Sequence, residues 1–127
     1  MDSIVTELDE RALAAYREGA KARSRALQER LEARRKRAWE VARRAASILK
    51  EEYGVTKVVG FGSLIHTHLF HLRSDVDLAV WGLTERDYYR AVGVLQSLDP
   101  AIGVDLVAFE DAKPALQDVI LRDGVSL

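Results

Sequence analysis

Two short stretches decide how this chain folds: Lys57-Val58-Val59-Gly60-Phe61-Gly62-Ser63 and Ser74-Asp75-Val76-Asp77-Leu78-Ala79-Val80. The first predicts a buried strand that runs into a Gly-Ser turn, and the second predicts a strand that opens with two acids one residue apart. Because side chains alternate between the faces of a strand, Asp75 and Asp77 should point the same way. Neighbouring carboxylates repel each other, and a divalent cation between them relieves the repulsion. We therefore expect a metal site at the start of the second strand.

A third acid stands alone in a later apolar run, Gly103-Val104-Asp105-Leu106-Val107-Ala108-Phe109. Burying an unpaired carboxylate is costly, so an acid inside an apolar strand needs a partner. The simpler interpretations are that Asp75 caps a turn and that Asp105 is a satisfied polar residue at the end of the sheet. With a Gly-Ser turn and all three acids present, we favour a site for a metal-bound triphosphate.

These residues resemble the minimal nucleotidyltransferase family, which belongs to the DNA-polymerase-β-like superfamily. The matching positions are Gly62-Ser63, Asp75-Val76-Asp77 and Asp105, and the resemblance covers roughly residues 36–110. It implies an α/β (α+β) fold, with a small mixed sheet flanked by helices. It also implies two Mg²⁺ ions held by Asp75, Asp77 and Asp105, which would be the catalytic residues, and a triphosphate held by Gly62 and Ser63. We expect Arg73 and Ser74 to contact the nucleotide as well, although Arg73 could instead pair with Asp75.

Small members of this family are often antitoxins paired with an all-helical HEPN-domain RNase toxin, and the resemblance implies that some transfer AMP from ATP to a tyrosine of that toxin. We therefore expect ATP as the substrate and a hydroxyl of a HEPN-type protein partner as the acceptor. Two alternatives remain open. The chain could be a catalytically silent antitoxin or scaffold. Thr67, four residues after Ser63, favours this alternative because it departs from the usual pattern of the family. It could also modify RNA or a small molecule together with a partner subunit.

The N-terminal third is built from strong helix formers between about Glu10 and Tyr53, without proline. Apolar residues recur at spacings of three, four and seven and predict one stripe along a helix. We interpret residues 1–34 as a long helical extension that contacts a partner or a second copy, and residues 35–127 as the nucleotidyltransferase domain. The alternative is a hairpin with a break near Gly19 or Ser24.

The helical region carries two basic clusters, Arg34-Arg35-Lys36-Arg37 and Arg43-Arg44. Clustered cations can neutralise nucleic-acid phosphates. The interleaved glutamates and the net charge of −1 instead favour a solvated, salt-bridged face or an acidic partner.

The remaining segments predict strands over residues 55–61 and 101–109, and helices over residues 85–97 and 113–123. The chain of 127 residues suits one small domain, and its lack of cysteine excludes disulfides. No apolar run approaches the length of a membrane span, so we expect a cytoplasmic protein without membrane contact. Three spacer histidines are interpreted as ordinary loop residues rather than a zinc site: His66, His68 and His71.

Overall fold

The computed structural model describes residues 2–127, with the side chains of residues 6–127, and shows the predicted α/β class. Its helices and strands are, in order, α1 (Asp2–Tyr53), β1 (Lys57–Phe61), β2 (Val76–Trp81), α2 (Glu85–Gln96), β3 (Val104–Ala108), α3 (Pro114–Asp123) and β4 (Val125–Ser126). Three 3₁₀ turns complete the fold: η1 (Gly62–Leu64), η2 (Thr67–Leu69) and η3 (Phe109–Asp111). Two of these turns, η1 and η2, lie in the spacer between β1 and β2.

The four strands form one mixed sheet in the order β3-β2-β1-β4. β1 is antiparallel to both β2 and β4, whereas β2 and β3 run parallel. In this register Asp77 lies between Phe61 on β1 and Asp105 on β3. β4 was not predicted, because two residues are too few to show a strand period.

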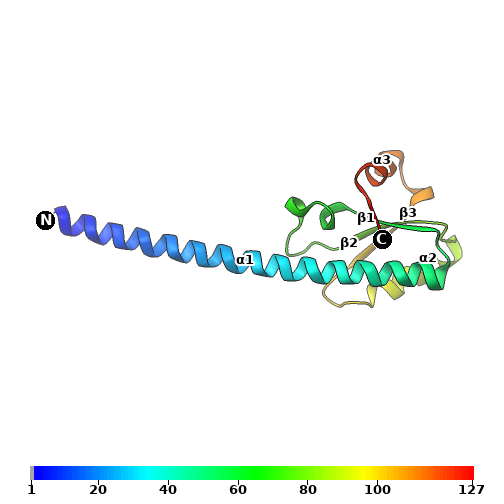
Figure 1. The fold of residues 1–127 in the computed structure, drawn as a ribbon, viewed down its shortest axis with the longest axis horizontal. Helices are drawn as coiled ribbons and strands as arrows, with labels where there is room; N and C mark the ends of the chain where they lie inside the picture. The colour runs from blue at the N-terminus through cyan, green and yellow to red at the C-terminus, as the bar shows by residue number, and fades with distance from the viewer. Residues whose placement is uncertain (1) are drawn as a thin grey trace. The chain divides into compact units, whose positions relative to one another are not determined.

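Helices cover both faces of the sheet. Figure 1 shows α3 on one side, and α2 with the C-terminal part of α1 on the other. On the α3 side, Ile120 packs with Val59, Phe61 and Ala79. The α1 and α2 residues that line the core recur at helical spacing and are almost completely buried: Ala38, Val41, Ala42, Ala45, Leu49, Ala91 and Leu95. With both faces covered, a slip of one residue between strands would bring the wrong side chains to each face.

Two local features explain where α1 ends and where α2 begins. Gly54 directly follows α1 with a φ of 64°, the left-handed conformation typical of a residue that ends a helix. Thr84 caps α2, since its Oγ1 accepts a hydrogen bond of 3.3 Å from the backbone N–H of Asp87. These residues set the ends of α1 and the start of α2.

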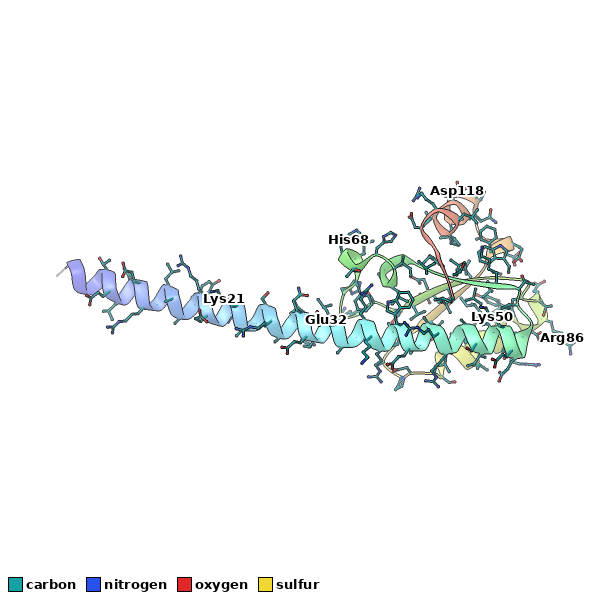
Figure 2. All side chains as sticks on the ribbon, in the orientation of Figure 1. Lys21, Glu32, Lys50, His68, Arg86 and Asp118 are labelled. Atoms are coloured by element: carbon teal, nitrogen blue, oxygen red, sulfur yellow. The ribbon has the colours of Figure 1, made fainter. Side chains whose placement is uncertain are left out.

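The chain divides into two compact units, Met1–Ala33 and Arg34–Leu127, and α1 contributes to both. The predicted alternative of a hairpin is wrong, because α1 is one helix and Gly19 and Ser24 lie inside it. In the first unit the side chains from residue 6 onward are nearly all exposed, as the sticks around Lys21 and Glu32 show in Figure 2. The exposed residues include the apolar stripe: Leu13, Tyr16 and Leu27 are 47%, 68% and 44% exposed.

A search for membrane-spanning segments covered the described residues. Within them, even the long α1 is too polar to cross a bilayer.

Candidate functional site

Two carboxylates meet where β2 and β3 begin. Asp77 and Asp105 occupy the same level of the parallel pair, with Asp77 half-buried and Asp105 exposed. Burial raises the pKa of Asp77 to about 6, helped by the charge of Asp105, a hydrogen bond between the two carboxyl groups and the charge of Asp75. These are the causes expected where acids crowd together without a counter-charge. The start of β2 and β3 therefore favours the binding of a positively charged ligand.

Gly62, the first residue after β1, leaves room for the carboxylate of Asp77. Its φ is 78°, and a Cβ at this position would lie only 2.4 Å from Oδ2 of Asp77. The carbonyl of Gly62 accepts hydrogen bonds of 3.1 Å from the N–H groups of both Ile65 and His66, which closes the turn. A side chain at Gly62 would thus strain the backbone and displace an acid of the site.

Asp75 is held differently from the other two acids. It lies one residue before β2, so the prediction that it belongs to the strand is wrong by one position. Its Oδ1 accepts a hydrogen bond of 3.0 Å from the N–H of Gly103 and lies 3.5 Å from Nη2 of Arg34. A Cβ on Gly103 would come within 2.8 Å of Oδ2 of Asp75. A second glycine therefore makes space for a second acid.

Arg34 belongs to this group and was not predicted as a site residue. Its Nε and Nη2 donate hydrogen bonds of 3.1 Å and 2.9 Å to the carbonyl oxygen of Ser74. Arg34 was predicted to belong to the extension and its cluster to form a solvated face, but its side chain is only 19% exposed. One signal was present: Arg34 falls at the helical spacing of the apolar stripe, three residues after Leu31 and four before Ala38.

The other predicted nucleotide contacts lie in the spacer. Ser74 is buried, and its Oγ accepts a hydrogen bond of 2.9 Å from the N–H of His71, so this hydroxyl holds the loop together. Arg73 is exposed, and within the described side chains the cation that pairs with Asp75 is Arg34 rather than Arg73. Ser63 lies in η1, directly after Gly62, and is partly exposed. Nucleotide contacts by Ser63, Arg73 and Ser74 stay predictions.

Two of the three spacer histidines contact each other, since the rings of His66 and His68 lie edge to face with their centroids 5.8 Å apart. Nε2 of His66 lies 3.7 Å from a carboxylate oxygen of Asp123. Nδ1 of His71 accepts a hydrogen bond of 3.1 Å from the N–H of Arg73. His68 is exposed on η2, where Figure 2 labels it.

The carboxylates of Asp75, Asp77 and Asp105 are chemically suited to bind a hard divalent cation. Among the described residues, no three His, Cys, Asp or Glu side chains stand close enough together to form a complete metal site. Asp77 and Asp105 face each other, whereas Asp75 is bonded to Gly103 and close to Arg34. Carboxylate oxygens are nevertheless the ligands that Mg²⁺ prefers, and a bound cation would offset the repulsion between Asp77 and Asp105 that, together with burial, raises the pKa of Asp77.

A cavity of about 340 Å³ lies at the opposite end of β3 from Asp105. It is lined by residues of α2, β3 and η3, among them Tyr88, Tyr89 and Ala108. It contains none of the predicted site residues.

Comparison with known proteins relates most of the second unit to one family. The family described as "Polymerase beta, Nucleotidyltransferase" matches residues 44–127, a range that contains the Gly-Ser turn and all three acids but not Arg34. No curated protein matches the chain.

Crystal structures of toxin–antitoxin pairs share the fold. One, a toxin–antitoxin with AMP-PNP, has a TM-score of 0.55 and 23% identity, and the match covers 65% of this chain and 69% of that chain. Another, the toxin–antitoxin MntA-HepT, has a TM-score of 0.53 and 20% identity, with 69% of each chain covered. A mutant of that pair gives a TM-score of 0.56 at 20% identity, covering 67% of this chain and 70% of that chain. At these identities the likeness establishes the fold.

The space requirement at Gly62 predicts the result of a matched pair of substitutions. Gly54→Ala should cost about 1 kcal/mol, because its φ is positive but no atom lies within 4 Å of the added Cβ. Gly62→Ala should cost about 1–3 kcal/mol more, since its Cβ also collides with Asp77. Urea unfolding of both variants measures the difference, and equal losses would show that Gly62 makes no room for the acid.

The raised pKa of Asp77 predicts how stability depends on pH without metal. A group whose pKa is raised in the folded state stabilises the fold below its unfolded pKa, and this contribution is lost as pH rises through the folded value of about 6. Asp77→Asn removes the charge and should therefore raise the melting temperature relative to the parent protein by more at about pH 7.5 than at about pH 4. Thermal unfolding in EDTA measures this, and a difference that does not change with pH would contradict the assignment.

Proposed function

The chain belongs to the polymerase β nucleotidyltransferase family, and on that premise we propose that it transfers AMP from ATP to a hydroxyl group of a partner protein. The observation that supports this most directly is the meeting of Asp77 and Asp105 beside Gly62. Two strand acids next to a turn without a side chain suit a metal-bound triphosphate better than they suit a structural ion pair, because no cation of the protein lies between them in the described contacts.

Each residue has a role in the proposed site. Mg²⁺ would be held by Asp75, Asp77 and Asp105. When bound, it neutralises part of the negative charge of the triphosphate and stabilises the attacking and leaving oxygens. Gly62 lets the backbone approach the phosphates closely, and the hydroxyl of Ser63 donates a hydrogen bond to a phosphate oxygen. Asp105 is exposed, so it is the acid that an acceptor group reaches from solvent.

The transfer needs no reactant besides ATP and the acceptor hydroxyl. The oxygen of the acceptor hydroxyl forms a bond to the α-phosphorus of ATP, and the bond from that phosphorus to the bridging oxygen breaks. Pyrophosphate leaves with the electron pair, and the hydroxyl proton passes to Asp105 or to water. Because the site supplies no nucleophile of its own, rigid placement of the acids at the strand ends carries the catalysis.

The proposed partner is a toxin, and the chain would be its antitoxin. The proposal draws on the shared fold with antitoxin complexes and on the first unit of the chain, whose apolar residues are exposed on a helix. A helix with large exposed apolar side chains gains stability when a partner covers them. The proposed partner is of the HEPN type, and the first unit is proposed as its contact surface.

The second candidate function is neutralisation of the partner by contact alone. The observation that favours it is that, among the described residues, no three acids or histidines stand close enough together to form a complete metal site. In that case a stable complex would form without nucleotide transfer.

Labelling with α-³²P-ATP and Mg²⁺ in the presence of the protein encoded next to this chain tests the proposal. We expect label and a mass gain of one or more AMP units on that neighbour. Asp77→Asn should reduce the labelling rate by about 100-fold, because it removes the charge of a metal ligand. Asp118→Asn is the matched control, since Asp118 is an exposed acid of α3, labelled in Figure 2, and should leave the rate unchanged.

The outcomes separate the two functions. A stable complex that never acquires label would contradict transfer and support neutralisation by contact. Equal labelling by Asp77→Asn and the parent protein would contradict the assignment of the acids.

A further inference from the structure

Arg34 reaches from α1 to Ser74 and Asp75, which lie 40 and 41 positions later in the sequence. Its Nε and Nη2 both donate to the carbonyl of Ser74, at 3.1 Å and 2.9 Å, and Nη2 also lies 3.5 Å from Oδ1 of Asp75. The same Oδ1 accepts the hydrogen bond from Gly103. Asp75 is therefore fixed by one arginine and one backbone N–H, which come from different parts of the fold.

We propose that Arg34 is the positioning residue of the metal site, an inference that rests on the proposed nucleotidyltransferase function. It holds Oδ1 of Asp75 toward the protein, together with Gly103, and so leaves Oδ2 to bind the cation. Within residues 6–127, the hydrogen bonds recorded for the Asp75 carboxylate involve Oδ1 alone. Partners of this kind orient a ligand and usually matter almost as much as the ligand itself.

The geometry explains why an arginine suits this position. The planar guanidinium presents several N–H donors at fixed angles, so it can donate twice to the Ser74 carbonyl and still face Asp75. A lysine carries its three N–H donors on a single nitrogen, so it cannot reproduce the two separated positions from which Nε and Nη2 donate. Arg34 is 19% exposed and Asp75 is 44% exposed, so solvent screens the contact mainly from the side of Asp75.

The strength of the two contacts matters for function. The hydrogen bonds to Ser74 are of ordinary length, whereas 3.5 Å to Asp75 is long for a hydrogen bond. The loop is thus the firm anchor of Arg34, and Asp75 is attracted mainly by charge. This arrangement orients the carboxylate and lowers the repulsion among the three acids without occupying both oxygens of Asp75.

A second arginine of α1 provides a matched control. Arg37 forms an ion pair with Asp99 through Nε and Nη2, with Nη2 2.8 Å from Oδ1. This pair also ties α1 to a loop of the second unit, and it holds the pKa of Asp99 below its usual range. Asp99 is not one of the site acids. Loss of Arg37 therefore reports the structural effect of removing an arginine tie that contacts none of the three acids.

The test measures Mn²⁺ binding to the full-length protein by electron paramagnetic resonance, without nucleotide, beside urea unfolding. We expect Arg34→Gln to weaken Mn²⁺ binding by about tenfold. Arg37→Gln should bind Mn²⁺ as the parent protein does, even where its stability falls. Arg34→Lys keeps the positive charge but loses the planar arrangement of N–H donors. Its affinity for Mn²⁺ should lie between those of Arg34→Gln and the parent protein.

Each result decides the matter. Unchanged or tighter Mn²⁺ binding by Arg34→Gln would overturn the positioning role while leaving the proposed function in place. An equal loss in Arg34→Gln and Arg37→Gln would reduce Arg34 to a structural tie and overturn the role too. A parent protein that binds no Mn²⁺ would overturn both the proposed function and this inference. If Arg34→Gln does not fold, Arg34→Lys decides: affinity equal to that of the parent protein overturns the role, and weakened affinity supports it.

Discussion

The parallel pairing of β2 with β3 forces the carboxylates of Asp77 and Asp105 together, and the rest of the site is arranged around that repulsion. The pairing cannot slip to relieve it, because Val76, Leu78, Val104 and Leu106 are buried on the same two strands. Burying the start of β2 raises the pKa of Asp77 and makes the repulsion more costly. The packed core thus keeps the carboxylates of Asp77 and Asp105 close together, with no positive charge of the described residues between them. The stability of the fold alone does not explain this arrangement.

The neighbouring residues accommodate the acids in three different ways. Gly62 and Gly103 leave out the side chains that would collide with Asp77 and Asp75. Arg34 supplies one positive charge, but at Asp75 rather than between Asp77 and Asp105. The unrelieved part of the repulsion lies at the exposed edge, which is where a metal-bound nucleotide would have to enter. The family relationship and this distribution of charge support the same interpretation of the site.

How far the sequence predicts this arrangement depends on the range of the interactions. The apolar runs around Asp77 and Asp105, and the cap at Thr84, are local patterns, so the core strands and the start of α2 could be predicted to within a few residues. The contact of Arg34 with Ser74 spans 40 residues and leaves no local pattern, so a cluster of basic residues was interpreted as a solvated face. The raised pKa of Asp77 likewise depends on burial, which the spacing of two acids does not give.

The central claim is that the acids at the start of β2 and β3 bind a divalent cation. Amide spectra recorded during a Mn²⁺ titration test it most directly, because paramagnetic broadening falls off steeply with distance from the ion. We expect the first amides to broaden to be those of Gly62, Asp77, Gly103 and Asp105. Broadening centred instead on the histidines of the spacer or on the acids of η3, or none at all, would contradict it.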